Sequence, residues 1–176
     1  MFHYIINWKG SILLTEINKE GEGQGDANSK AFYELQGLRN QKEKMEASYH
    51  EIFPKVDPYL VHDLLLRMYQ DPVKNKNKGP MYTVEVFTKV GTDSQKCKDH
   101  ILATTGTVPG IYDKGTHYVT HMRLTIEILK KLNDFDYVLG IMGDYTGSNP
   151  SMGPRYDIGD FQKRRQEVDD RKKNIS

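Results

Sequence analysis

The sequence predicts an α+β fold, and three observations lead to that prediction. Residues 81–145 contain strand and helix patterns in the order strand, helix, two strands, helix, strand. Two longer helical patterns, at 29–53 and 57–70, precede this unit. The composition, with 37% hydrophobic and 28% charged residues, is typical of a globular protein towards the polar end of the range. We therefore expect one α+β domain with residues 81–145 at its centre.

The first strand of the central unit is predicted from the alternation of side chains over residues 81–90. Tyr82 and Val84 fall on one face, whereas Glu85 and Phe87 fall on the other. Such a period of two, rich in β-branched residues, is typical of a half-buried strand.

A helix and a hairpin are predicted to follow this strand. Thr92 and Gln95 have the spacing of a capping box, and Gly106 is placed to end the helix. The hairpin arms are expected at 108–112 and 117–125. The second arm also permits a helical interpretation, but its threonine, tyrosine and valine content favours a strand.

A short helix over 125–133 and a strand over 137–142 complete the unit. The order β-α-β-β-α-β resembles the ferredoxin-like fold. Regulatory domains for small molecules, dimeric α+β barrels and RNA-binding modules all use this fold, so the resemblance concerns structure and not function. It implies that the strands at 81–90 and 117–125 are central neighbours.

The remaining residues are predicted to cover the central unit. Residues 1–72 are expected to form a β-hairpin and two helices, joined to the unit by a lysine-rich connection at 73–80. The predicted domain spans 1–158. Residues 159–176 are charged nearly all round and are predicted to be a tail, either a frayed helix or a docking segment.

Charge and composition narrow the functional classes. The net charge of +1 provides no general attraction for nucleic acid or an anionic membrane, so neither partner is expected. No apolar run approaches the ~20 residues of a membrane-spanning helix. Cys97 is the single cysteine, which excludes an intrachain disulfide and leads us to expect a cytoplasmic protein. We find no phosphate-loop or nucleophile motif and expect no cofactor.

Cys97, His100, His117 and His121 imitate the spacing of metal ligands. On a strand, however, residues four apart are separated by about 13 Å, at about 3.3 Å per residue. Zinc–nitrogen bonds of about 2.0–2.1 Å then prevent the last two histidines from sharing one ion. We therefore predict no metal site.

The outward face of the predicted sheet is the best candidate for a binding site. His117, His121 and Arg123 share that face of one central strand, and Phe87 points outward from its neighbour. We expect these four residues to bind a small anion or an aromatic acid. Ordinary cross-strand pairing on a partly wet face is the simpler alternative.

Proton transfer is a second possibility for this face. His121, Glu85 and Asp144 are the candidates for acid and base, and whether the protein is an enzyme stays open. The final strand is apolar on both faces, which predicts a cover on each side. The N-terminal helices or a second subunit would supply the second cover.

Two functions follow from this reasoning. The first is a homo-oligomeric small-ligand-binding or regulatory module of ferredoxin-like fold. The second is a small enzyme of the dimeric α+β barrel kind, with His121 as acid or base.

Overall fold

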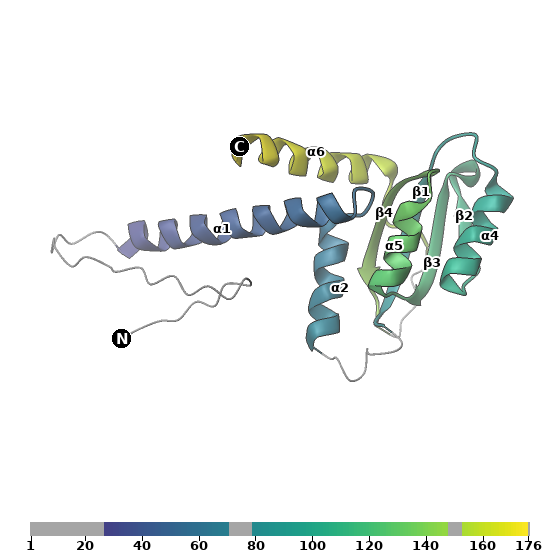
Figure 1. Cartoon of the computed structure of the whole chain (residues 1–176), viewed down its shortest axis with the longest axis horizontal. Coiled ribbons are helices and arrows are strands. Elements are labelled where there is room, and N and C mark those ends of the chain that lie inside the picture. Colours follow the sequence, from purple (N-terminus) through teal and green to yellow (C-terminus); the bar gives the residue numbers. More distant parts are fainter. Residues whose placement is uncertain (1–26, 71–78, 148–152, 176) are drawn as a thin grey trace. The chain divides into compact units, whose positions relative to one another are not determined.

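The computed structural model describes residues 27–70, 79–147 and 153–175. The chain divides into two compact units, residues 1–36 and 37–176, and each is described by itself. Within the described residues the fold is mixed α+β, with a four-stranded sheet and five α-helices (Figure 1). The expected hairpin at 2–17 and the connection at 73–78 lie outside the described residues.

Helix α1 (Ala27–Ile52) confirms the predicted helix at 29–53. Its first part, residues 27–36, belongs to the first unit, where the side chains from residue 30 onward are exposed. In the second unit, Leu38 and Ile52 of this helix are exposed while Glu46 is buried. Tyr49, on the same face as Ile52 by its spacing, packs against the main core, so the apolar residues of this helix are buried only in part. Glu46 accepts a hydrogen bond from Arg171 of helix α6 (Ile158–Ile175), at 2.7 Å.

The sheet has the strand order β2-β3-β1-β4, and its three strand pairs are antiparallel. The strands are β1 (Met81–Thr88), β2 (Gly110–Tyr112), β3 (His117–Arg123) and β4 (Val138–Tyr145). Strands β1 and β3 are central neighbours, as the sequence predicts. Strand β3 also settles the predicted arm at 117–125 as a strand.

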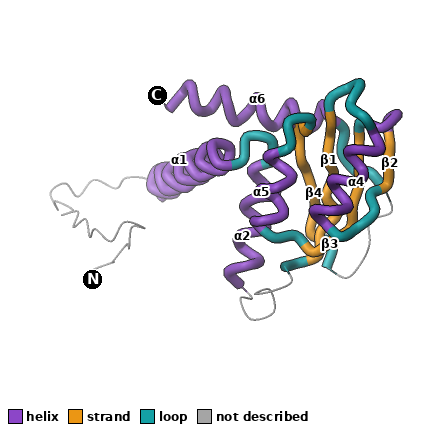
Figure 2. The backbone as a smooth tube through the Cα atoms, turned by 45° about the vertical axis from the view of Figure 1, so that its right-hand side comes forward, coloured by secondary structure: helices purple, strands orange, loops and turns teal. Residues whose placement is uncertain are grey.

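Helices α4 (Ser94–Thr105) and α5 (Ile126–Asp134) lie on the same side of the sheet (Figure 2). The start of α4 is capped by Asp93, whose side chain accepts from two backbone N–H groups, and not by Thr92 as the spacing suggested. Gly106 ends α4 in the left-handed conformation, with φ of 70°, as predicted.

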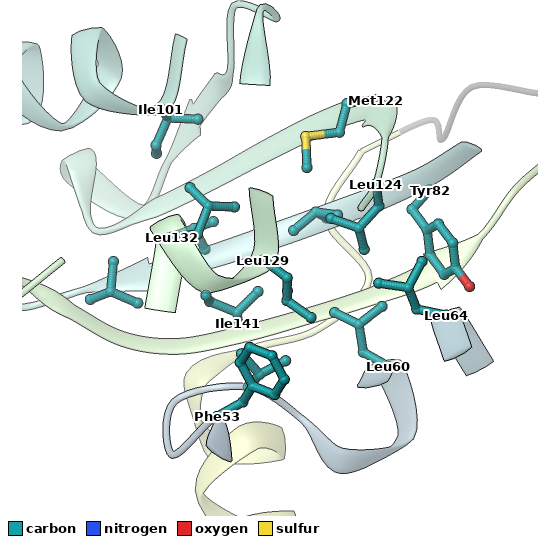
Figure 3. Close-up of a cluster of buried hydrophobic side chains, with 14 of the residues drawn as sticks. Phe53, Leu60, Leu64, Tyr82, Ile101, Met122, Leu124, Leu129, Leu132 and Ile141 are labelled. Atoms are coloured by element: carbon teal, nitrogen blue, oxygen red, sulfur yellow. The ribbon is translucent and has the colours of Figure 1, made fainter. Parts of the chain in front are cut away.

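The core between the sheet and these helices contains the inward faces of the two central strands. Tyr82 and Val84 of β1 are both buried, on the same face as predicted, and Tyr118 and Met122 of β3 are buried in the same cluster. Helix α2 (Pro58–Gln70) extends this core, because its Leu60 and Leu64 join the same cluster (Figure 3).

Strand β4 is covered along its outer edge and on its outer face. The backbone of residues 55–57 pairs with it: the N–H of Ile141 donates to Lys55 and its C=O accepts from Asp57. On the outer face, Phe161 of α6 packs with Phe87 and Met142 in a second apolar cluster. Both faces of β4 are thus covered, as predicted. The outer face is covered by α6, which belongs to the predicted tail, and not by the N-terminal helices or a second subunit.

The side-chain alternation of β4 differs from the predicted one. The ladder with β1 is irregular between Phe87 and Thr88, so Val138 and Ile141 both enter the main core. Leu139, which regular alternation would place on the same face as Ile141, is 37% exposed. A bulge of this kind shifts a strand by one residue, and the alternation alone does not reveal it.

None of the described helices is long and apolar enough to cross a membrane. The division into a domain at 1–158 and a tail at 159–176 stays a prediction.

Candidate functional site

The predicted site residues separate into two groups on the outer face of the sheet. Phe87 and His117 stack with ring centroids 4.4 Å apart, and both are buried. His121 is half-buried further along β3, where its Nδ1 lies 3.4 Å from the hydroxyl of Thr83 and 3.3 Å from that of Thr146. Arg123 donates to the C=O of Gly79 at 3.0 Å. The structure thus places Phe87 and His117 together in a buried stack, and His121 and Arg123 further along β3.

Glu85 lies beside His117 in the covered part of this face. Its carboxylate is 1% exposed, and its Oε2 lies 3.0 Å from Nε2 of His117. The other ring nitrogen, Nδ1, lies 3.3 Å from Oδ2 of Asp113, at the start of the short 3-10 turn η1 (Asp113–Gly115). The imidazole is thus placed between two carboxylates.

The same carboxylate binds the chain that leads into α6. Backbone N–H groups of Arg155 and Tyr156 donate to Glu85 at 2.7 and 3.2 Å. These bonds join residues that are 70 and 71 positions apart in the sequence. They satisfy the buried carboxylate and set the position of both residues.

Asp144, the third acid–base candidate, lies next to these two residues. Its carboxylate accepts from the hydroxyl of Tyr156 at 2.7 Å and from the guanidinium of Arg155 at 3.3 Å. Burial, together with the hydrogen bond to Asp144, raises the pKa of Tyr156 to about 12. The phenol therefore acts as a donor over the physiological pH range.

A second charged pair lies towards the end of α2. Asp63 accepts from Nε of Arg67 at 2.8 Å and from the hydroxyl of Tyr82 at 2.6 Å. Burial and the neighbouring Asp63 carboxylate raise the pKa of Tyr82. The guanidinium of Arg67 lies 3.4 Å above the ring of Tyr145, a cation–π contact.

A third pair joins α2 to α6. Asp57, 2% exposed, is hydrogen-bonded to Arg164 and to the backbone N–H of Tyr59. Burial raises the pKa of Asp57, and the attraction of Arg164 opposes that rise. Arg164 also lies over the rings of Tyr59 and Tyr156, at 5.5 and 5.2 Å from their centroids.

These three pairs line one open groove of about 790 Å³, bounded by α2, the end of β4, residues 155–156 and α6. Its basic side chains come from Arg67, Arg155, Lys163 and Arg164, and its acidic ones from Asp57, Asp63, Asp144, Asp160 and Glu167. Tyr59, Tyr145 and Tyr156 supply aromatic surface. The charges of the lining nearly balance. This volume falls within the range usual for sites that bind small molecules.

Of the residues singled out from the sequence, Asp144 alone lines the groove, and Glu85 lies behind its wall. Sequence reasoning missed Arg155, Tyr156 and Arg164. Their roles depend on α6 folding back over the sheet, and residues 143–154 read as a loop with no periodic signal.

The residues with metal-like spacing are held apart. Cys97 is in the main core, while His100 lies near the hydroxyl of Tyr137, at 3.2 Å, and stacks on Phe135. In the part of the chain that the structure describes, no three histidine, cysteine or acidic side chains are grouped to hold a metal ion. The absence of a metal site stays a prediction for the whole chain.

Comparisons of the chain with protein-family models, curated proteins and solved structures find no match.

Proposed function

We propose that this protein is a small-ligand-binding module and that the groove between α2, β4 and α6 is its binding site. One observation carries the proposal. Three arginine–carboxylate pairs and three tyrosines, from segments as far as 107 residues apart, converge on one cavity of about 790 Å³. Ionisable and aromatic groups that gather in a cavity are typical of ligand sites.

The ligand class follows from the charge balance of the lining. A purely anionic ligand would separate an arginine from its carboxylate and leave that carboxylate without its cation. A ligand with both charges can replace both partners. The groove therefore favours a small zwitterion with an aromatic part, which differs from the anion or aromatic acid expected from the sequence by its added positive charge.

Arg155 and Asp144 are the pair most suited to bind such a ligand. The side chain of Arg155 is 53% exposed, compared with 33% for Arg67 and 32% for Arg164. Its contact with Asp144, at 3.3 Å, is also longer than the one between Arg67 and Asp63. A ligand carboxylate would bind Arg155, and an ammonium group would bind Asp144.

The aromatic part of the ligand would pack on exposed tyrosine. Tyr59 and Tyr145 line the groove and are 41% and 44% exposed. Ring faces that remain in contact with water gain free energy when an aromatic ligand covers them.

A titration with three related compounds tests this proposal. Phenylalanine carries both charges, benzoate only the negative one and benzylamine only the positive one. We expect phenylalanine to shift the backbone NMR signals of residues 143–145 and 155–156. Each of the other compounds should bind about 10-fold to 100-fold more weakly, the cost of one charge-assisted hydrogen bond.

Two variants assign the roles of the pair. Arg155→Gln should weaken benzoate and leave benzylamine unchanged, and Asp144→Asn should do the reverse. Arg165→Gln is the matched control, because Arg165 is exposed on α6 and is not part of the groove lining. Groove signals that none of the three compounds shifts would overturn the proposal.

The proposal includes a ferredoxin-like fold for residues 81–145. The element order, the strand order and the antiparallel pairing support it. It also places the protein in the cytoplasm, an expectation that rests on the single cysteine of the sequence.

Homo-oligomerisation remains part of the proposal. Leu65, Leu66 and Tyr69 lie on neighbouring positions of α2 and are 38%, 43% and 86% exposed. Exposed apolar groups of this kind occur at subunit contacts. Light scattering on the full chain, compared with Tyr69→Ser, measures the assembly directly; a monomeric wild type would remove this part of the proposal.

The alternative function, a small enzyme with His121 as acid or base, stays a prediction. His121 faces two threonine hydroxyls and is not among the residues that line the groove. The arrangement of the described residues therefore favours binding over catalysis.

A further inference from the structure

Both oxygens of the buried Glu85 carboxylate are engaged. Oε1 accepts from the N–H of Arg155 at 2.7 Å, and Oε2 accepts from that of Tyr156 at 3.2 Å. Oε2 also lies 3.0 Å from Nε2 of His117. A carboxylate this deeply buried needs hydrogen bonds and a counter-charge to stay ionised. The backbone groups supply hydrogen bonds, and His117 is the described side chain that forms an ion pair with Glu85 when its ring is protonated.

Both ring nitrogens of His117 have a carboxylate partner. Each ring nitrogen faces a carboxylate oxygen, Nε2 that of Glu85 and Nδ1 that of Asp113. A neutral imidazole offers one N–H donor, whereas an imidazolium offers two. The protonated ring therefore satisfies both carboxylates.

The backbone around Asp113 brings this outer carboxylate to the ring. Asp113 and Lys114 have φ of 48° and 57°, and Gly115 has φ of 88°. Two consecutive non-glycine residues in the left-handed region cost free energy, and surrounding contacts must hold them there. The contact with His117 is one such interaction.

We propose that Glu85 is a positioning residue of the groove and that the protonated ring of His117 holds it in its working state. Glu85 itself does not line the groove. It fixes the backbone of Arg155 and Tyr156, whose side chains line the groove, and so determines where the Arg155–Asp144 pair stands. The consequence for binding rests on the proposed function, whereas the positioning of the backbone does not.

The proposal predicts a dependence on pH. Loss of one proton from His117 leaves a neutral ring that still donates to Glu85 but no longer balances its charge. The buried carboxylate then becomes more costly, and its bonds to residues 155–156 weaken. Among the described charged groups, Asp113 of η1 contacts the His117 ring, and Asp144 of β4 lies two positions along the same face from Met142, the partner of Glu85, where it binds Arg155. Tyr112 and Phe87 contribute uncharged rings.

Amide hydrogen exchange, followed by NMR and corrected for the intrinsic effect of pH, tests the proposal on the full chain. In the wild type we expect protection of the Arg155 and Tyr156 amides to fall about tenfold as the pH rises through the range in which histidine loses its proton. Protection of the Val84 amide, in the central strand β1, should not show this step.

Four variants give the proposal distinct outcomes. Glu85→Gln should lower protection of both amides about tenfold at every pH, and His117→Gln should remove the step. Asp113→Asn, at an exposed position, should alter the step because it removes the carboxylate that faces Nδ1 of the ring. Glu46→Gln is the matched control. Glu46 is also a buried acid, but it pairs with Arg171 of α6 and not with residues 155–156.

A wild-type step that persists unchanged in both His117→Gln and Asp113→Asn would overturn the proposal, even if Glu85→Gln did not fold. Phenylalanine affinity, measured over the same pH range, is the second measurement. If exchange shows the step but phenylalanine never binds, positioning stands and the proposed ligand function fails. If phenylalanine binds with no step in exchange or affinity, the ligand function stands and the role of His117 fails.

Discussion

Phe161 of α6 lies directly over Gly140 of β4. A Cβ added to Gly140 would come within 2.6 Å of the Phe161 ring, closer than side chains approach one another. The glycine thus lets the helix pack on the outer face of the sheet. This contact holds α6 against the sheet, where the helix forms one wall of the groove.

Gly140→Ala should therefore destabilise the fold. The aromatic ring must move away from Phe87 and Met142 to admit the methyl group, and overpacking of this kind costs about 1–3 kcal/mol. Urea unfolding measures the change. The same substitution at Gly37, inside α1 and with no atom near its Cβ position, is the control and should stabilise by about 0.5–1 kcal/mol. Equal effects at the two glycines would contradict the packing argument.

Removal of residues 159–176 should reduce stability more than the loss of a solvated tail would. Phe161 and Val168 are 4% and 6% exposed, and without Phe161 the side chains of Phe87 and Met142 become accessible to water. Burial of one phenylalanine alone contributes about 1.5–3 kcal/mol. Thermal unfolding of the 1–158 chain measures the loss. An unchanged melting temperature would support the predicted division at residue 158.

Alkaline pH should destabilise the protein in part through Tyr156. Its folded pKa of about 12 lies above the usual value of 10, so the unfolded chain loses this proton first. The stabilisation is complete below about pH 10 and is lost as the pH rises towards 12. Tyr156→Phe should flatten this part of the stability profile, and it should cost about 1 kcal/mol at neutral pH because Asp144 loses a donor. Denaturant unfolding from pH 8 upward provides the profile; a parallel wild-type curve would exclude Tyr156 as its source.

The strands of the sheet could be predicted from the sequence because each one has its own local pattern of alternating side chains. Alternation over residues 81–90 placed Tyr82 and Val84 in the core, and glycine at 106 marked a helix end. The irregularity at Phe87 and Thr88 escaped prediction because it depends on pairing with β4.

The groove escaped prediction for a related reason. Helix α6 carries only two described apolar side chains that become buried, Phe161 and Val168, so its periodic signal is weak. The pair Asp57–Arg164 joins residues 107 positions apart, and neither position stands out in its own segment. Glu85 was identified as outward-facing, but its partners on residues 155–156 follow only from the return of the chain over the sheet.

The pair Asp57–Arg164 leads to a final prediction about pH. Arg164→Gln removes the cation from a carboxylate that is 2% exposed, and breaking a buried pair in this way costs about 3–5 kcal/mol. Burial raises the folded pKa of Asp57 above its unfolded value, so the folded state binds this proton more tightly. Stability from this group therefore increases as the pH falls through the folded pKa, and loss of Arg164 enlarges that dependence.

We thus expect Arg164→Gln to be most damaging at neutral pH and least damaging in mild acid. Asp57→Asn with Arg164→Gln should recover part of the loss, because the amide carries no charge and its oxygen can still accept from the N–H of Tyr59. Urea unfolding of the two single variants and the double variant, at about pH 5 and about pH 7, completes the cycle. A loss from Arg164→Gln that is the same at both pH values would show that Asp57 is not the residue through which Arg164 acts.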